Sequence, residues 1–152
     1  MLRIGVISDT HGLLRPEALA ALQGCDHIIH AGDIGNENIL QALAEIAIVT
    51  AIRGNNDKGS WAKELQETRR LQFEDVHLYV IHDIKELDIQ PAAEGISVVI
   101  CGHSHKPVIR QDDGVLYLNP GSAGPRRFKL PITVAELIID EKSIAPRITQ
   151  LG

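Results

Sequence analysis

Five stretches of this chain place polar, chemically reactive side chains directly after short apolar runs. These side chains are two carboxylates, one amide and four imidazoles: Asp9, His11, Asp33, Asn55, His82, His103 and His105. Residues i and i+2 of an extended segment point the same way, so His103 and His105 can face one site from the end of a strand. Asp9 and His11 have the same spacing. In open α/β sheets ligands bind at the carboxyl ends of the strands, so we expect these side chains to converge there.

Side chains of these types are typical ligands of divalent metal ions. Seven ligands are more than the about four to six that one ion binds, and the set contains no thiolate. This composition favours two adjacent ions of the Mn, Fe, Zn or Co type. Two such ions, about 3.5–4 Å apart, can clamp a phosphoryl group and lower the pKa of a bridging water toward about 7. The predicted chemistry is therefore hydrolysis of a phosphate ester, with a metal-bridging hydroxide as nucleophile.

Length and composition are those of one globular domain. The chain has 152 residues, of which 44% are hydrophobic and 23% charged, and this predicts a single domain over residues 1–152. No apolar run approaches the about 18 residues of a membrane span. The N-terminal segment Met1–Val6 lacks the pattern of a signal peptide. We therefore expect a cytoplasmic protein with no membrane partner.

Net charge and aromatic content narrow the range of binding partners. The formal net charge is −5, and the aromatic residues are two Phe, two Tyr and one Trp. An extended nucleic-acid surface needs basic stripes and stacking rings, so we expect none, whereas a small phosphate ligand is compatible with this composition. Cys25 and Cys101 lie far apart in the sequence, without the clustered spacing of a zinc site, and are predicted to be buried thiols.

Alternating strands and helices are predicted to position the polar residues in the first two-thirds of the chain. Strands are expected at residues 2–8, 26–30, 46–52, 76–81 and 96–101. Helices are expected to begin at Pro16 and after Asn36, which can cap the second one. The nearly continuous apolar run 46–52 predicts a strand buried on both faces. Residues 58–70 have no clean periodicity and predict a loop with a possible short helix, and residues 91–94 predict one helical turn.

After His105 the turn signals come closer together and predict a β-meander. Hairpins are expected at residues 107–118, around Asp112-Asp113-Gly114, and at residues 132–151. Asn119-Pro120-Gly121-Ser122 is predicted to be a loop between them.

A glycine stands directly before three of the polar residues. These glycines are Gly32, Gly54 and Gly102. At such positions the chain can turn sharply and keep side-chain bulk away from an ion. We therefore expect each glycine to make room for the site.

In chain order these motifs resemble a known family. They are Asp9-Thr10-His11, Gly32-Asp33, Gly54-Asn55-Asn56-Asp57, His82 and Gly102-His103-Ser104-His105, followed by Asn119-Pro120-Gly121-Ser122. The chain resembles the calcineurin-like metallophosphoesterases of the small, single-domain phosphodiesterase branch, and the resemblance covers essentially the whole chain. It implies an α/β (α+β) fold: a four-layer αββα sandwich of two mixed β-sheets flanked by helices.

The same resemblance implies how the ligands divide between two ions. Three ligands belong to each ion and one is shared: Asp9, His11 and His105 for the first, Asn55, His82 and His103 for the second, and Asp33 bridging both. The implied cofactors are two divalent transition-metal ions. Manganese is favoured, and Fe, Zn, Ni and Co are the alternatives.

Two positions depart from the family pattern. Many relatives have a histidine where this chain has Asn56, and that histidine can protonate the leaving oxygen, whereas an amide can only donate a hydrogen bond. We therefore expect phosphodiesters or activated esters to be better substrates than alkyl monoesters. Asp83 follows His82 where relatives often have glycine. The predicted catalytic residues are Asp33 and Asn56.

Substrate contacts and function class leave alternatives open. The predicted contacts to substrate phosphate are Asn56, Arg126 and Arg127. For the two arginines, the alternative is that they lie in a solvated loop or at a subunit contact. Asp57 is expected either to orient a ligand histidine or to cap a turn. A retromer subunit of eukaryotes resembles the same fold and acts mainly through protein contacts, so a scaffold is the alternative to an enzyme. A nuclease or nucleotide phosphatase of the same fold, and a homo-oligomer, are also compatible with the sequence.

Overall fold

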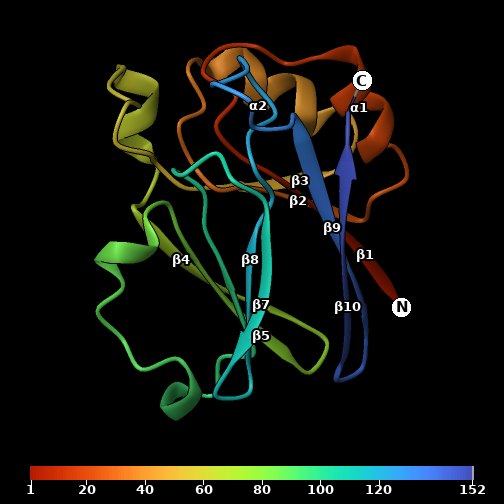
Figure 1. The fold of residues 1–152 in the computed structure, drawn as a ribbon. Helices are drawn as coiled ribbons and strands as arrows, with labels where there is room; N and C mark the ends of the chain where they lie inside the picture. Colours follow the sequence, from red (N-terminus) through yellow and green to blue (C-terminus); the bar gives the residue numbers. More distant parts are fainter. Residues whose placement is uncertain (152) are drawn as a thin grey trace.

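Two β-sheets packed face to face form most of the computed structural model, which describes residues 1–151 (Figure 1). The first sheet has the strand order β10-β9-β1-β2-β3 and the second the order β4-β5-β6-β8-β7. The strands are β1 (Leu2–Ile7), β2 (His27–His30), β3 (Ile48–Ala51), β4 (Thr68–Phe73), β5 (Val76–Ile81), β6 (Val98–Ile100), β7 (Val108–Asp112), β8 (Val115–Asn119), β9 (Thr133–Asp140) and β10 (Ser143–Gln150). The two α-helices are α1 (Pro16–Leu22) and α2 (Glu37–Ala44).

Helices and short helical turns cover the outer faces of the two sheets. Helices α1 and α2 pack on the first sheet through buried residues that include Leu22 and Leu43. The outer face of the second sheet is covered by side chains from two 3-10 turns and their flanks, η2 (Ile84–Glu86) and η3 (Ala92–Glu94). Pro91 and the left-handed Gly95 enclose η3 and keep it to one turn. The predicted sandwich of two mixed sheets is confirmed, with 3-10 turns forming its fourth layer.

The main core lies between the two sheets. On β6, Val98 and Ile100 belong to this core, whereas Val99 between them points to the outer layer. Side chains of a strand alternate between its two faces, so a strand covered on both faces needs apolar residues throughout. The continuous apolar run before His103 is explained in this way.

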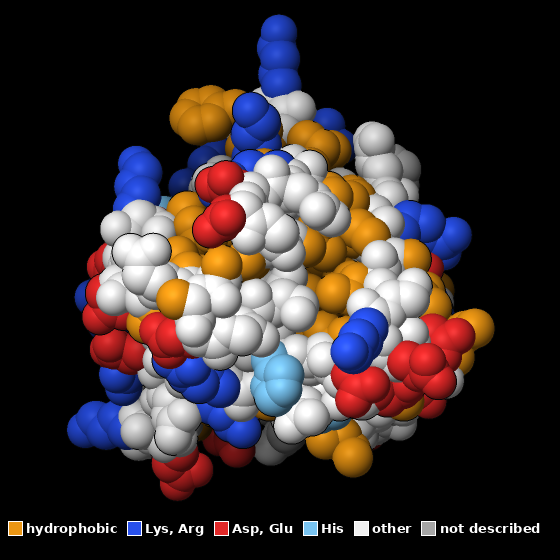
Figure 2. Space-filling view, turned by 90° about the horizontal axis from the view of Figure 1, so that it is seen from below, with side chains coloured by type: hydrophobic (Ala, Val, Ile, Leu, Met, Phe, Trp, Pro, Cys, Tyr) orange, Lys and Arg blue, Asp and Glu red, His pale blue; other side chains and the backbone are white. Residues whose placement is uncertain are grey.

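The strands that lead to the polar residues all end at the same side of the sandwich. Strands β1, β2 and β3 are parallel, and so are β5, β6 and β8. The three hairpin turns, β4–β5, β7–β8 and β9–β10, lie together at the bottom of Figure 1, at the opposite end. Figure 2 views the molecule from this end and shows acidic and basic side chains interspersed around its rim.

Three predictions about strands were wrong. Residues 68–73 form β4, an edge strand paired with β5, although part of this segment was predicted to be a loop. The strand was missed because its polar side chains hide the alternation of apolar and polar residues that marks a strand. The third strand is an edge strand and not buried on both faces, because Ile48 is 72% exposed. Both hairpins of the predicted meander are present, but they do not lie next to each other in one sheet. Strand β8 is parallel to β6 in the second sheet, whereas β9 pairs with β1 in the first.

Other local predictions are confirmed. A 3-10 helix, η1 (Ser60–Glu64), occupies the predicted short helical segment. Cys25 and Cys101 are buried free thiols, and burial raises the pKa of Cys101 to about 12. Asn36 is the N-cap residue of α2, but its side chain makes no capping hydrogen bond. Within residues 1–151, no helix has the length and apolar character needed to cross a membrane.

The core between the sheets can be tested against the exposed edge. Ile29 is fully buried in this core, whereas Ile48 is 72% exposed. We expect Ile29→Ala to lower the free energy of unfolding by about 2–5 kcal/mol, through lost burial and a cavity. Ile48→Ala is the matched control and should cost less than about 1 kcal/mol. Urea unfolding of both variants checks this, and equal losses would contradict the assigned edge position of β3.

Candidate metal centre

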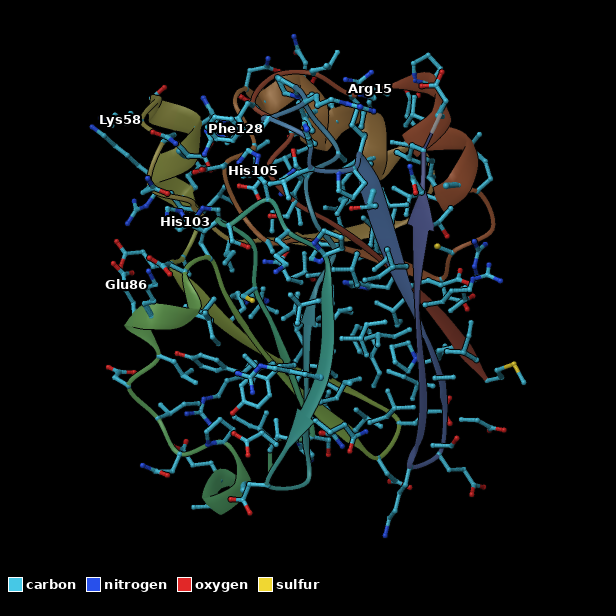
Figure 3. The ribbon with its side chains drawn as sticks, viewed as in Figure 1. Arg15, Lys58, Glu86, His103, His105 and Phe128 are labelled. Carbon is cyan, nitrogen blue, oxygen red and sulfur yellow. The ribbon has the colours of Figure 1, made fainter. Side chains whose placement is uncertain are left out.

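The loops that follow five strands bring the predicted ligands together in two groups. The possible ligand atoms of Asp9, His11 and His105 lie within 4.8 Å of one another, and those of Asp33, His82 and His103 do so as well. The loop after β1 contributes to the first group and the loop after β6 to both, and Figure 3 shows His103 and His105 near each other at the upper end of the second sheet. The two groups contain six of the seven predicted ligands, all except Asn55.

Asp33 lies where the two groups meet. Its Oδ2 is 3.7 Å from Nε2 of His11 and 3.2 Å from Nε2 of His82, one imidazole from each group. Asp9 also lies close to both, because its Oδ1 is 3.5 Å from Nε2 of His105 and 3.8 Å from Nε2 of His82. The two groups therefore form one continuous centre.

Four atoms of the predicted ligands are buried without a hydrogen-bond partner. They are Oδ1 of Asp9, Nε2 of His11, Nε2 of His82 and Nδ1 of His105. A buried polar atom that lacks a partner costs about 1–3 kcal/mol, so four such atoms in one site need an explanation. Divalent transition-metal ions bind imidazole nitrogens and carboxylate oxygens and would satisfy atoms of these types. The residues present thus fit the metal ions that the sequence predicted.

Hydrogen bonds aim the free atoms of these ligands into the centre. Nδ1 of His82 lies 2.7 Å from the carbonyl oxygen of Ala31 and donates to it, which leaves Nε2 free. Oδ2 of Asp9 accepts from the hydroxyl of Ser8 at 2.8 Å and from the backbone N–H of His103 at 3.0 Å, which leaves Oδ1 free. Such partners fix the tautomer and orientation of a metal ligand.

The backbone is left-handed at five of the seven predicted ligands. Asp9, His11, Asp33, His103 and His105 have φ between 47° and 70°. Non-glycine residues rarely adopt this region, which costs of order 1–3 kcal/mol at each position and is concentrated at functional sites. The fold therefore holds these five residues in turns of sparsely populated backbone conformation, close together at one end of the sheets.

Glycines before the ligands allow the loops to pack tightly. A Cβ on Gly32, whose φ is +102°, would lie 2.7 Å from Nδ1 of His82. A Cβ on Gly102 would lie 2.1 Å from the hydroxyl oxygen of Ser8 and 2.8 Å from Oδ2 of Asp9. The atoms that a Cβ would meet belong to neighbouring loops. The two glycines therefore allow these loops to pack against one another.

Asp57 caps a turn and joins two of the loops. Its carboxylate accepts hydrogen bonds from the backbone N–H groups of Ile34, Gly35 and Gly54, at 2.9–3.1 Å. These bonds connect the loop of Asp33 to the loop of Asn55. Of the two expected roles for Asp57, the structure supports the turn cap.

The loop after β8 supports the centre from the other side. The side-chain amide of Asn119 donates to the carbonyl oxygen of Gly102 at 2.9 Å and to the hydroxyl of Ser104 at 3.1 Å. The hydroxyl of Ser122 donates to the carbonyl oxygen of Asp9 at 3.1 Å. Sequence reasoning placed Asn119 and Ser122 only in a loop. Their positions in the Asn-Pro-Gly-Ser motif, directly after a predicted strand, could have indicated that these two side chains support the site.

Two clefts flank His103. The acidic cleft has a volume of about 580 Å³ and is lined by His103, His82 and Asn55 together with Glu67, Asp83, Glu86 and Asp88. The basic cleft, of about 420 Å³, is lined by His103 and Asn119 together with Lys85, Arg110, Tyr117 and Arg127. Asn55 thus shares a wall with His82 and His103, the two histidines expected to bind the same ion.

The predicted substrate contacts have different surroundings. The backbone N–H and side-chain amide of Asn56 donate to Oδ1 and Oδ2 of Asp33, at 3.0 and 3.1 Å, so Asn56 lies at the centre. Arg127 lines the basic cleft, and its charge contributes to the lowered pKa of His105. Arg126 is exposed and lines neither cleft. The structure therefore brings Asn56 and Arg127, but not Arg126, to the centre or its clefts.

Asp83 adopts an ordinary conformation despite its unusual position. Its φ and ψ are −110° and 114°, and its Oδ1 accepts from the backbone N–H of Lys85 to cap η2. Its Oδ2 lies 3.7 Å from Nε2 of His103. The residue that replaces glycine here therefore faces a predicted ligand, which the sequence did not indicate.

The protonation states at neutral pH suit cation binding. Burial raises the pKa of Asp9. Burial acts in the same direction on Asp33, but the adjacent imidazole of His82 and hydrogen bonds from Asn56 outweigh it, so the pKa of Asp33 lies well below its usual range. Burial and the nearby charges of Arg127 and His11 lower the pKa of His105 to about 4. Asp33 is therefore a carboxylate and His105 a neutral imidazole at pH 7.

His30 supports the centre from β2 without facing it. Its Nδ1 accepts from the backbone N–H of Gly32 at 3.1 Å, and its Nε2 lies 3.0 Å from the hydroxyl of Thr10, which donates to the carbonyl of Ile34. The side chain is fully buried, and burial lowers its pKa to about 3. His30 is therefore neutral in the folded protein.

This burial makes stability depend on pH. Between pH 6.5 and 3 the unfolded chain binds a proton at His30 that the folded chain does not, so stability falls as the pH decreases. From pH 7 to 5 the wild type should lose on the order of 2 kcal/mol more than His30→Gln. Urea unfolding of both proteins at the two pH values, in the presence of a chelator, measures this difference. Parallel losses in the two proteins would contradict it.

A two-sheet sandwich with clustered imidazoles and carboxylates at its strand ends defines a class of metal-dependent hydrolases, and comparison identifies the family. Residues 2–142 match the calcineurin-like phosphoesterase superfamily domain. A probable metallophosphoesterase of Methanothermobacter thermautotrophicus is 34% identical, over 98% of this chain and 92% of that protein. Phosphodiesterase YfcE of Escherichia coli is 28% identical, over 95% of this chain and 91% of that protein. The chain therefore belongs to the calcineurin-like phosphoesterase superfamily.

The fold extends to structures with little sequence similarity. Vps29 of Entamoeba histolytica, in complex with Zn²⁺, superposes with a TM-score of 0.79 at 19% identity, covering 99% of this chain and 100% of that one. At this identity the likeness concerns the fold alone. Membership of the superfamily makes the present chain a metal-dependent phosphoester hydrolase of the small-domain branch.

Proposed function

We propose that this protein is a dinuclear metal-dependent phosphodiesterase that acts as a single domain over residues 1–152. The observation that carries the proposal is the position of Asp33, whose Oδ2 lies within 3.7 Å of imidazoles from both ligand groups. One carboxylate between two sets of ligands is the arrangement that a pair of ions needs. The relatives named phosphodiesterase and metallophosphoesterase support the reaction class.

Seven residues would hold the ions. The first ion is assigned to Asp9, His11 and His105, the second to Asn55, His82 and His103, and both to Asp33. When bound, two divalent ions supply charge neutralisation for the phosphate and lower the pKa of the attacking water. Manganese is our first candidate, with Fe, Zn, Ni and Co as alternatives, because imidazole and carboxylate ligands suit all of them.

The remaining residues bind and orient the phosphate. The amide of Asn56, which donates to Asp33, is exposed at the centre and can turn its N–H donors to a phosphate oxygen. An amide has no proton to give to a leaving group, so the leaving group must depart as a stable anion. Arg127 adds a positive charge at the edge of the basic cleft, where it can draw an anionic ester to the centre. A small phosphodiester with a good leaving group meets these conditions.

Replacing the shared carboxylate tests the central assignment. Asp33→Asn removes a negative charge between the two groups, and we expect hydrolysis of bis-para-nitrophenyl phosphate to fall by about 100-fold or more. Metal content, measured by elemental analysis after reconstitution with Mn²⁺, should fall below two ions per chain. Asp75→Asn, in the exposed turn between β4 and β5, removes the same charge at the far end and is the matched control.

Two outcomes would argue against the proposal. Wild-type activity in Asp33→Asn would show that this carboxylate does not hold the catalytic ions. Fewer than two bound ions in the wild-type protein, together with no hydrolysis of any phosphodiester, would favour a protein-interaction scaffold of the same fold.

The missing acid at Asn56 leads to a prediction about leaving groups. Asn56→His places a group with a pKa near about 6.5 beside Asp33, where it can protonate a departing alkoxide. We expect the variant to gain at least about tenfold on methyl para-nitrobenzyl phosphate, whose leaving groups are poor, relative to bis-para-nitrophenyl phosphate. The ratio of the two kcat/KM values, compared with that of the wild type, is the measurement. An unchanged ratio would show that leaving-group protonation is not limited at this position.

A further inference from the structure

The two clefts on either side of His103 differ in charge. The acidic cleft contains the carboxylates of Glu67, Asp83, Glu86 and Asp88 and a single basic side chain, Arg53. Arg53 is already paired with Glu67 at 2.9 Å. Figure 3 shows Glu86 on this side, below His103. An anionic group is therefore disfavoured in the acidic cleft.

The basic cleft has the opposite balance. Lys85, Arg110 and Arg127 line it, and Asp83 is the only carboxylate among the residues that line it. Asp83 stands between the two clefts, with Oδ2 3.7 Å from Nε2 of His103. Arg110 also lies 3.7 Å from Asp112, but the two side chains are 51% and 69% exposed, and such exposed pairs contribute little. The cleft therefore keeps an excess of positive charge next to a predicted metal ligand.

The walls of the basic cleft are partly apolar. Ile84, Val108 and Tyr117 line it, and the guanidinium carbon of Arg110 lies 4.2 Å from the centroid of the Tyr117 ring. This stacking holds the planar guanidinium against an aromatic surface. A pocket with apolar walls and a few placed charges is typical of a binding site for an organic group. At about 420 Å³ it is large enough for a substituted aromatic ring.

Resting on the proposed phosphodiesterase function, we propose that the basic cleft binds the organic arm of the substrate that stays on the phosphate and selects arms carrying a second negative charge. A phosphate bound at the centre would lie near His103, which lines both clefts, so one ester arm could extend into each of them. The acidic cleft repels a charged arm, and the basic cleft attracts it through Lys85 and Arg110. The substrate class is a phosphodiester with an apolar arm that ends in an anionic group.

Two matched esters test this selection. Both release para-nitrophenolate; the remaining arm is para-carboxybenzyl in one and the neutral isostere para-carbamoylbenzyl in the other. Hydrolysis forms one P–O bond from water, breaks the P–O bond to para-nitrophenolate and releases one proton. We expect the Mn²⁺-loaded wild type to prefer the carboxylate ester by about fivefold in kcat/KM, mainly through KM. Added salt should reduce the preference.

Variants identify the residues responsible. In Lys85→Gln/Arg110→Gln both side chains are changed at exposed positions, and the preference between the two esters should fall to about one. Lys142→Gln, in the turn between β9 and β10, removes a positive charge at the other end of the molecule and should keep the preference. Calorimetric titration with the two product monoesters gives a readout that does not depend on turnover. The para-carboxybenzyl product should bind the wild type more tightly than its neutral isostere, and bind the double variant equally.

The outcomes separate this inference from the proposed function. Equal kcat/KM for the two esters in the wild type would overturn the inference and leave the phosphodiesterase intact. A preference retained in the double variant would also overturn it, because the charge would then be recognised elsewhere. No hydrolysis of either ester by metal-loaded protein would overturn the proposed function and the inference with it.

Discussion

The carboxylate of Asp33 is the point on which the rest of the site depends. It lies beside two imidazoles, His11 from the loop after β1 and His82 from the loop after β5. It also accepts hydrogen bonds from the backbone N–H and the side-chain amide of Asn56. These contacts lower its pKa far enough to keep it charged at any physiological pH. A charge this well buried is expensive without partners, so the surrounding loops must be placed accurately. The two-sheet sandwich provides that accuracy by ending five strands at one side.

The site contains several features that oppose stability. Five of the predicted ligands have left-handed backbone, and four of their polar atoms are buried without partners. The surrounding hydrogen bonds offset these costs: Asp57 joins the loops of Asp33 and Asn55, and Asn119 holds the loop of His103. Strain of this kind persists only where neighbouring structure over-determines the local conformation. The supporting residues are therefore as much part of the centre as the ligands, although they touch no substrate.

The sequence predicted which polar residues lie together at the strand ends, but not the order of the strands in the two sheets. Strand-end residues such as Asp33 and His82 are marked by their type and by the apolar run before them, and parallel strands bring such ends together. Strand β4 was missed because its Arg69, Arg70 and Gln72 lack the pattern of a buried strand, and Ile48 was placed in the core because an apolar side chain does not show which strand forms the edge. Edge and centre are properties of the whole sheet, and a local pattern carries no information on them.

Local sequence patterns also could not predict the difference in charge between the two clefts. The net charge of −5 describes the chain as a whole, and it says nothing about how charges are distributed around a pocket. Lys85, Arg110 and Arg127 come from η2, β7 and the loop after β8, and only the fold brings them around one pocket. Acidic residues from the position before β4 and from η2 and its flanks collect on the other side of His103 in the same way. Because electrostatic attraction acts over about 8–10 Å at physiological salt, recognition depends on these local groupings. A protein with a net negative charge can therefore present a basic pocket beside its candidate metal centre.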